Sequence, residues 1–241
     1  MDDLTENASN TTQAAGVAGW LHRLWPGRCV ACAAPAGGAD LCTGCRDGLA
    51  PNRICCQRCA LPLAEPAVAC GRCLRHVPSF DLAWSPWCYA SPLDLIVLKL
   101  KFRADLAAAR VLGGLWSEQL ERLPAAKPEL LIPVPLARDR LIERGYNQAM
   151  ELARPLAKSL SLPLRPAALR RVRATDPQSG LSAKARKRNL AGAFVADSAV
   201  SGQRVAIIDD VMTTGATMQA CAKALKRAGA IEVQAWALAR A

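Results

Sequence analysis

The stretch "VAIIDDVMTTGATM" (residues 205–218) decides the fold, because an apolar run, two acids and a threonine- and glycine-containing loop follow one another directly. Residues 204–209 are predicted to form a buried strand, and residues 215–230 have the apolar spacing of a helix. A loop between a strand and a helix N-terminus presents backbone N–H groups, and the helix dipole favours an anion there. The stretch therefore predicts an anion site with carboxylates beside it.

The side chains of this stretch suit a phosphorylated sugar. Gly215 lets the backbone approach a ligand closely, and the hydroxyls of three threonines can donate to a phosphate, namely Thr213, Thr214 and Thr217. Asp209 and Asp210 are then placed for ribose hydroxyls or a hydrated Mg²⁺. The alternative is an ordinary acid-rich turn with a threonine N-cap.

Strands alternate with helices through the second half of the chain. Strands are predicted at 82–90 (interrupted by Pro86), 129–135, 204–209 and 231–239, and helices at 91–102, 104–123, 147–160 and 215–230. This alternation predicts an α/β fold, with a parallel sheet and helices on both faces. Ligands of such sheets sit beyond the carboxyl ends of the strands, so "PVPLARDR" (133–140) is expected to meet the acids in one crevice.

Nine of the eleven cysteines lie between positions 29 and 73, and eight of them form four pairs with two residues between partners. The pairs are Cys29/Cys32, Cys42/Cys45, Cys56/Cys59 and Cys70/Cys73. Two such pairs supply four thiolates for one tetrahedral zinc, which predicts two zinc sites rather than disulfides or redox pairs. The equal spacings favour sequential grouping, with an interleaved arrangement left open, and Cys55 is expected to be a spectator. Four ligands on each metal leave no open position, so both zincs are predicted to be structural.

The chain of 241 residues suits one ordinary domain with a small appendage. Its formal net charge is +11, and residues 138–188 hold thirteen Lys/Arg against four Asp/Glu. Such a stretch suits the phosphates of a nucleotide sugar or a nucleic acid, the alternative being a solvated basic face. The N-terminus lacks the basic region of a secretory signal, and "LDLIVLKLKF" (93–102) is too short and too charged to span a bilayer. We therefore expect a cytoplasmic protein without an integral membrane segment.

The motifs resemble a known family. "VAIIDDVMTTGAT" (205–217) is similar to the phosphoribosyl-pyrophosphate (PRPP) signature of type I phosphoribosyltransferases. Together with the cysteine pairs and "RGYNQA" (144–149), it resembles the ComF family of competence proteins, which are double zinc ribbon, phosphoribosyltransferase-like proteins. Further similar segments are "CALPL" (59–63), "CGRC" (70–73), "LKLKFR" (98–103), "IPVPL" (132–136), "QSGLS" (178–182) and "RKRNLAGAF" (186–194).

The resemblance implies a domain organisation and a set of site residues. It implies a polar tail with a short helix (1–25), a double zinc ribbon (26–77) and a Rossmann-like type I phosphoribosyltransferase domain (78–241). Asp209 and Asp210 would face the PRPP ribose and its metal. The 5′-phosphate would be wrapped by Thr213, Thr214, Gly215, Ala216 and Thr217, and the pyrophosphate would face Val134, Pro135, Leu136, Ala137 and Arg138, with Arg144 and Asn147 nearby. Residues 173–189 would match a mobile closing loop.

The resemblance also implies the function. We expect a PRPP- and Mg²⁺-binding protein that acts in DNA uptake and natural transformation, with single-stranded DNA and proteins of the uptake machinery as partners. One alternative is an active phosphoribosyltransferase on an unidentified base or other nucleophile. Asp209 or Asp210 would then be the base or electrostatic stabiliser, and the leaving pyrophosphate would be stabilised by Arg138, Arg144, Arg186 and Arg188. Another alternative is a zinc-dependent interaction module with a vestigial nucleotide site. No separate segment for an acceptor-binding hood is present, and the zinc ribbon is one candidate for that place.

Overall fold

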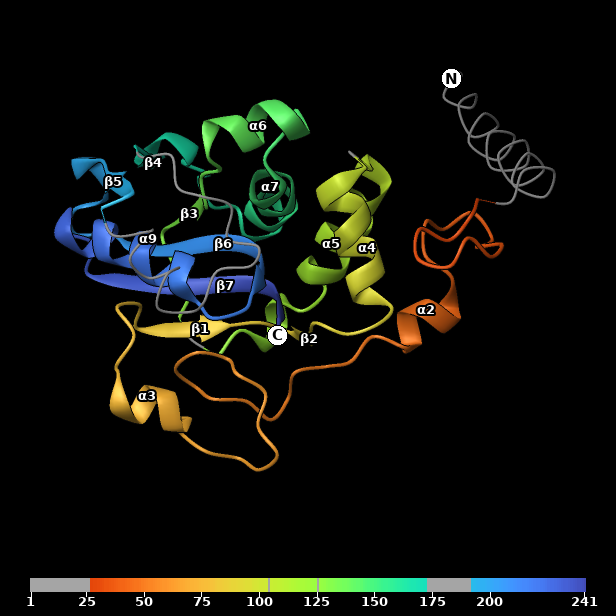
Figure 1. Ribbon diagram of the computed structural model, residues 1–241, viewed down its shortest axis with the longest axis horizontal. Coiled ribbons are helices and arrows are strands. Elements are labelled where there is room, and N and C mark those ends of the chain that lie inside the picture. Colours follow the sequence, from red (N-terminus) through yellow and green to blue (C-terminus); the bar gives the residue numbers. More distant parts are fainter. Residues whose placement is uncertain (1–26, 104, 125, 173–191) are drawn as a thin grey trace, which may run out of the picture. The chain divides into compact units, whose positions relative to one another are not determined.

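The computed structural model describes residues 27–103, 105–124, 126–172 and 192–241 (Figure 1). The chain divides into two compact units, Met1–Gly48 and Leu49–Ala241. In the described part of the first unit, helix α2 (Thr43–Asp47) begins directly after Cys42. The second unit holds the sheet, the remaining described helices and the second group of four cysteines.

The second unit is built on a parallel sheet. Its strands lie in the order β1 (Leu82–Trp84), β7 (Glu232–Arg240), β6 (Arg204–Met212) and β3 (Leu130–Pro133), and β2 (Trp87–Cys88) also pairs with β7 in parallel. Nearly every residue of β7 is buried, as expected of a parallel sheet covered on both faces. The predicted α/β fold is therefore confirmed.

Helices cover both faces of this sheet (Figure 1). On one face, Val205 and Ile207 of β6 share a core cluster with Met218 and Cys221 of α9 (Ala216–Arg227). Because side chains alternate along a strand, Trp236 of β7 points to the opposite face from its neighbour Ala235, which belongs to that cluster. There the ring centroid of Trp236 lies 5.2 Å from that of Trp84, which lies 6.1 Å from that of Trp116 in α5 (Leu106–Ser117).

Three helices build the layer on the tryptophan face. Helix α4 (Leu93–Phe102) packs on α5, and α5 packs on α7 (Gln148–Leu160), which contacts β3 and β6. Asn147 is the N-cap of α7, and its Oδ1 accepts a hydrogen bond of 3.0 Å from the backbone N–H of Ala149. Helices α5 and α7 cross closely: a Cβ added to Gly113 would lie only 2.5 Å from Cγ of Pro155.

Some elements differ from the predicted ones. The long helix expected at 104–123 ends at Ser117 and is followed by a short 3-10 turn, η1 (Leu120–Arg122). Helix α6 (Arg138–Arg144), the hairpin of β4 (Leu169–Arg171) and β5 (Phe194–Ala196), and the turns η2 (Pro166–Ala168) and η3 (Ser198–Val200) were not predicted. Strand β6 continues three residues beyond the predicted end at Asp209, because its backbone stays paired with β7 as far as Met212 and Arg240.

The second group of cysteines belongs to the core beneath α9. Cys56, Cys59, Cys70 and Cys73 are all buried, and they share a core cluster with residues of α9 and β6. The short helix α3 (Gly71–Arg75) begins directly after Cys70, contains Cys73 and precedes β1 in the chain. No helix in the described ranges has the combination of length and apolarity that crossing a lipid bilayer requires.

Candidate functional site

The cysteines form two clusters in sequential order. Within each cluster the four sulfur atoms all lie within 4.8 Å of one another, in the groups Cys29, Cys32, Cys42, Cys45 and Cys56, Cys59, Cys70, Cys73. The Sγ atoms of Cys32 and Cys42 are 3.8 Å apart, and those of Cys59 and Cys70 are 3.7 Å apart. A tetrahedron with Zn–S bonds of about 2.3 Å has edges of about 3.8 Å, so both clusters fit zinc. Cys55 belongs to neither cluster.

Each cluster contains a thiol that ionises near neutral pH. Burial raises the pKa of Cys29, but hydrogen bonds from the backbone of Cys42 and Cys32 outweigh it and lower the pKa to about 6. The pKa of Cys70 is likewise lowered to about 7, against its burial, by hydrogen bonds that include the backbone of Cys73. Burial and the neighbouring thiols instead raise the pKa of Cys45 and of Cys73 well above the usual value. Zinc binds the thiolate rather than the thiol, so the two thiols of low pKa favour metal binding, whereas Cys45 and Cys73 would lose their protons only on binding the metal. Four sulfur ligands would fill the coordination shell of a zinc ion and leave no position for water. The role of the metal would therefore be structural.

The two acids lie within the last part of β6 rather than in the loop after it. Because side chains alternate along a strand, Asp209 and Asp210 point to opposite sides of β6. Asp210 is only 7% exposed, and its Oδ1 lies 3.1 Å from Nζ of Lys101, near the end of α4. Burial, with the charge of Asp210, raises the pKa of Asp209 to about 7, although the charges of Lys101 and Arg144 act in the opposite direction.

The threonine loop ends at the N-terminus of α9. Gly215 is the N-cap, and its φ of 73° lies in the left-handed region that favours glycine. Thr214 Oγ1 accepts a hydrogen bond of 3.3 Å from the backbone N–H of Ala216, whereas Thr213 is exposed and Thr217 half-buried. The first turn of α9 carries no acidic side chain, and Gly215 has no side chain that could accept a hydrogen bond from it. Backbone N–H groups at the start of a helix favour an anion.

The loop after β3 lies beside the acids. The backbone N–H of Val134 donates to the carbonyl of Ile208, one residue before Asp209, at 2.9 Å. Nδ2 of Asn147 donates to the carbonyl of Val134 at 3.0 Å, so the Asn147 amide holds this loop while its oxygen caps α7. Pro135 and Leu136 follow Val134. The segments that end β3 and β6 therefore meet at one edge of the sheet, with Ala137 as the N-cap of α6.

Two of the predicted arginines lie on α6. Arg138 is exposed in its first turn. The guanidinium carbon of Arg144 lies 5.4 Å from the ring centroid of Phe102, and its buried Nε has no hydrogen-bond partner among the described residues. The charge of Arg144 also lowers the pKa of Asp209, against the larger effect of burial. Arg186 and Arg188 fall outside the described residues.

The structure adds two basic residues that sequence reasoning did not place at the site. Lys101 reaches Asp210 from α4, and its only signal in the sequence is that it is one of two lysines in the last turn of a largely apolar helix. Arg240 ends the buried strand β7 and is 1% exposed. Its Nε donates to the carbonyl of Cys59 at 3.0 Å, and one terminal nitrogen donates to the carbonyls of Met212, at 2.7 Å, and Thr213. A charged residue at the end of an apolar strand was the available signal.

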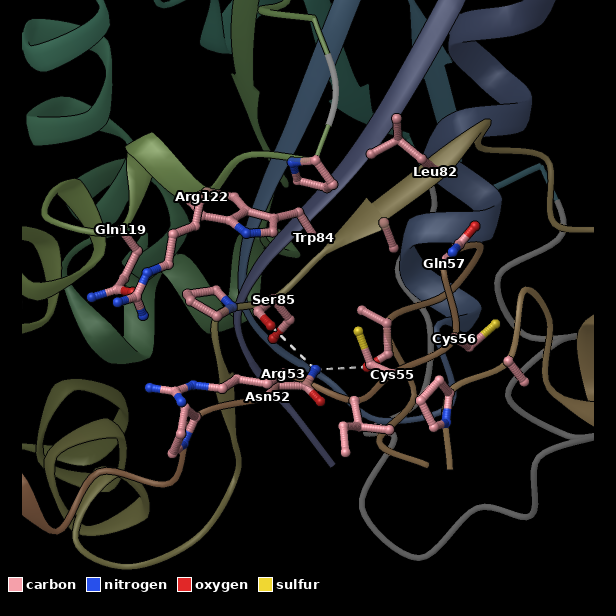
Figure 2. A pocket seen from close by; sticks show the side chains of 18 residues that line it. Asn52, Arg53, Cys55, Cys56, Gln57, Leu82, Trp84, Ser85, Gln119 and Arg122 are labelled. Carbon is pink, nitrogen blue, oxygen red and sulfur yellow. Dashed lines mark hydrogen bonds between the residues drawn. The ribbon is translucent and has the colours of Figure 1, made fainter. Parts of the chain in front are cut away.

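A cavity of about 760 Å³ lies elsewhere in the second unit and includes none of the predicted PRPP residues (Figure 2). It is lined by the segment around Cys55 and Cys56, by β1 and by η1. The side-chain amide of Asn52 links two segments of the lining, because it donates to the carbonyls of Ala60 at 2.8 Å and Ser85 at 3.2 Å. Figure 2 shows two exposed arginines extending to the same side of this cavity, Arg53 and Arg122.

Family models match two parts of the chain. The family model of the double zinc ribbon domain matches residues 20–74, and that of the phosphoribosyl transferase domain matches residues 146–241. The first of these matches spans the division between the two compact units. The chain is also similar to phosphoribosylpyrophosphate amidotransferase from B. subtilis, solved with ADP and GMP, at 18% identity and a TM-score of 0.41, over 58% of this chain and 30% of that one.

Three curated relatives match most of the chain. DNA utilization protein YhgH of Salmonella typhimurium is 38% identical over 221 residues, which cover 89% of this chain and 97% of the relative. Competence protein F of Haemophilus influenzae is 37% identical over 208 residues, covering 83% of this chain and 90% of the relative. Competence protein ComFC of Bacillus subtilis is 28% identical over 160 residues, 65% and 63% of the two chains. The chain therefore belongs to the ComF family of competence proteins, which join a double zinc ribbon to a phosphoribosyltransferase domain.

Proposed function

We propose that this protein binds PRPP with Mg²⁺ where β3 and β6 end and α9 begins, and that it serves DNA uptake and natural transformation as a cytoplasmic partner of single-stranded DNA. The observation that carries the proposal is the arrangement of Asp209, Asp210 and the open N-terminus of α9 at one edge of a parallel sheet. The names of the relatives, which are competence and DNA utilization proteins, support the biological role. A reducing cytoplasm would keep the eight thiols available for zinc.

The 5′-phosphate is assigned to the loop of residues 213–217. Gly215 lets the backbone turn there, and the N–H groups of the first turn of α9 supply donors at the positive end of a twelve-residue helix. The hydroxyls of Thr213 and Thr217 add further donors. This end of the helix carries no acidic side chain that would compete with the phosphate.

The ribose and the metal are assigned to the two acids. Carboxylate oxygens bind Mg²⁺ directly or through its water, and the pyrophosphate would share the ion, which neutralises part of its charge. Lys101 pairs with Asp210 and balances its charge. The loop Val134–Ala137 and the guanidinium of Arg144 are assigned to the pyrophosphate, with Arg138 at the rim.

Titration calorimetry with PRPP, with and without Mg²⁺, tests the binding function. We expect saturable binding of one PRPP per chain that Mg²⁺ strengthens, and weaker binding of ribose 5-phosphate and of pyrophosphate, each of which fills half of the site. Zinc-replete protein that binds none of the three compounds would contradict the proposal. That result would favour the remaining alternative, an interaction module with a vestigial nucleotide site.

Single-stranded DNA is assigned to the basic stretch 138–188. Binding to a polyanion weakens steeply with salt, with a log–log slope of about −0.7 per phosphate contacted. Replacing Arg186, Lys187 and Arg188 by alanine should make the slope shallower by up to about two units. The comparison variant replaces Arg53 and Arg122 at the cavity. A slope altered only in the cavity variant would move the DNA site there, and a wild-type protein without DNA binding would remove DNA from the proposal.

A working phosphoribosyltransferase is the second candidate, and the raised pKa of Asp209 favours it. With the metal held by Asp210 alone, the carboxyl group of Asp209, with a pKa of about 7, would be suited to act as a general base near neutral pH. Arg138, Arg144 and the arginines at 186 and 188 would stabilise the leaving pyrophosphate. Release of pyrophosphate from PRPP, measured with a panel of bases and other nucleophiles, separates the two candidates. Release that requires one acceptor and is lost in Asp209→Asn would establish the transferase.

A further inference from the structure

The second cysteine cluster is continuous with the threonine loop. Cys56, Cys59, Cys70 and Cys73 share a buried core cluster with Met212 at the end of β6 and with Met218 in the first turns of α9. The amide of Gln219 in α9 also binds the segment that follows α3: its Oε1 accepts from the backbone N–H of Ser79 at 2.9 Å, and its Nε2 donates to Ser79 Oγ at 2.8 Å. The cluster and the loop therefore form one packed body.

Arg240 joins the two directly. Its guanidinium is buried and donates at one side to the carbonyl of Cys59, whose sulfur belongs to the cluster, and at the other to the carbonyls of Met212 and Thr213. These two carbonyls lie at the start of the loop. A planar guanidinium with donors in a fixed fork holds such acceptors at set positions, which a flexible ammonium does not.

Arg72 approaches the same loop from α3. It lies between Cys70 and Cys73, and its Nη2 is 3.8 Å from the point that a Cβ on Gly215 would occupy. Its side chain is exposed, and its charge lowers the pKa of the neighbouring Arg240, in addition to the larger effect of burial. A guanidinium beside a helix N-terminus that lacks an acidic side chain is placed to bind a phosphate oxygen pair.

We propose that Arg72 is a phosphate-binding residue of the PRPP site and that Arg240 is the positioning residue through which the second zinc cluster fixes the threonine loop. The inference rests on the proposed PRPP function and extends it, because the zinc ribbon then supplies one of the side chains that bind the ligand. The phosphate concerned is the 5′-phosphate, since Gly215 lies in the loop assigned to it.

Arg72→Gln tests the ligand contact, with Arg75→Gln on the same short helix as the matched control. Calorimetry with PRPP, ribose 5-phosphate and pyrophosphate gives the affinities, and metal analysis gives the zinc content. A lost charge-assisted hydrogen bond weakens binding about tenfold to a hundredfold. We expect this loss in Arg72→Gln for PRPP and ribose 5-phosphate but not for pyrophosphate, with zinc content unchanged, and wild-type affinities in Arg75→Gln.

The outcomes separate this inference from the function on which it rests. If wild-type protein binds PRPP and Arg72→Gln binds it equally well, Arg72 is no ligand and the inference fails while the proposed function stands. If the control variant weakens binding as much, the effect is one of general charge and the inference also fails. If wild-type protein binds neither PRPP nor ribose 5-phosphate, the proposed function itself fails.

Arg240→Gln and Arg240→Lys test the positioning role. We expect Arg240→Gln to retain both zinc ions and to lose at least about tenfold in affinity for ribose 5-phosphate while keeping its affinity for pyrophosphate. Arg240→Lys, which keeps the charge but not the fork of donors, should fall between this variant and the wild type. Equal losses for both ligands would show that Arg240 acts only through general stability, and unchanged affinities would show that it does not position the loop.

Discussion

Lys101 and Asp210 form an ion pair between α4 and β6, with Nζ 3.1 Å from Oδ1 and with side chains that are 23% and 9% exposed. The lysine stands beside one of the two carboxylates assigned to the metal. Its ammonium group supplies positive charge beside the carboxylate, as a bound divalent ion would. We therefore predict that Lys101 and a bound metal ion compete for the negative charge of Asp210.

Replacement of Lys101 by methionine is expected to strengthen binding of Mn²⁺, used as a probe for Mg²⁺ in the absence of PRPP. Removing a cation so close to Asp210 should raise the Mn²⁺ affinity at least about fivefold, because the site becomes more negative. Electron paramagnetic resonance of free Mn²⁺ measures this affinity. Lys99→Met, which removes the same charge two residues earlier on α4, should leave it within twofold, roughly the effect of net charge alone. Equal or weaker binding in Lys101→Met would contradict the assignment of the metal to this carboxylate.

The stability of the ligand-free protein should fall as pH rises, through Asp209. Burial and the charge of Asp210 raise its pKa from 3.8 to about 7, so the folded protein binds this proton more tightly than the unfolded chain does. The contribution is favourable at low pH and is lost between about pH 4 and pH 7. Asp209→Asn, which is neutral throughout, should gain in melting temperature relative to the wild type between pH 5 and pH 8 in Mg²⁺-free buffer. A difference in melting temperature between the two proteins that becomes smaller as pH rises would contradict this expectation.

Gly113 and Gly114 provide a matched pair for the packing of α5 on α7. A Cβ at Gly113 would lie 2.5 Å from Cγ of Pro155, whereas one at Gly114 meets no atom within 4 Å. Gly113→Ala should therefore destabilise the fold by about 1–3 kcal/mol, because the helices must separate. Gly114→Ala should stabilise it by up to about 1 kcal/mol, because alanine is the better helix former. Urea unfolding of both variants measures the difference, and a Gly113→Ala protein as stable as the wild type would show that the helices do not cross this closely.

Zinc analysis distinguishes the two clusters. The protein should contain two zinc ions, of which Cys29→Ser loses one and Cys56→Ser the other. Only the second cluster lies in the compact unit that holds the sheet, so only Cys56→Ser should lower the melting temperature of that unit. Less than one zinc per chain would end the claim of two sites. Loss of the same ion in both variants would contradict the sequential grouping.

The parallel sheet was predictable because its signals are local. The apolar runs around Ile132 and Ile207 and the helical spacing after Gly215 each identify an element within a few residues. The cysteine pairs were predictable for the same reason, since metal ligands in a knuckle are neighbours in sequence. The end of β6 was not predictable, because its continuation through Asp210 to Met212 depends on pairing with β7. In the sequence alone, acids and threonines at the end of a strand resemble a loop.

The further parts of the site depend on contacts between distant residues. Lys101 is separated from Asp210 by more than a hundred residues, and Arg240 from Cys59 by 181. In neither pair does the local sequence around one residue indicate that it will contact the other. The second cysteine cluster raises the same difficulty, because it packs against residues of α9 and β6 that are distant in the sequence. Such placement is decided by the shape of the whole core.

The central claim is that Asp209 and Asp210, with the loop that follows them, bind PRPP. Calorimetric titration of PRPP with Mg²⁺ into the double variant Asp209→Asn, Asp210→Asn tests it most directly. Each acid is expected to contribute about 1.5–3 kcal/mol through charge-assisted contacts, so affinity should fall at least about tenfold. The control, Glu121→Gln with Asp197→Asn, removes two charges at exposed positions and should bind like the wild type. A folded, zinc-replete double variant with wild-type affinity for PRPP would contradict the account.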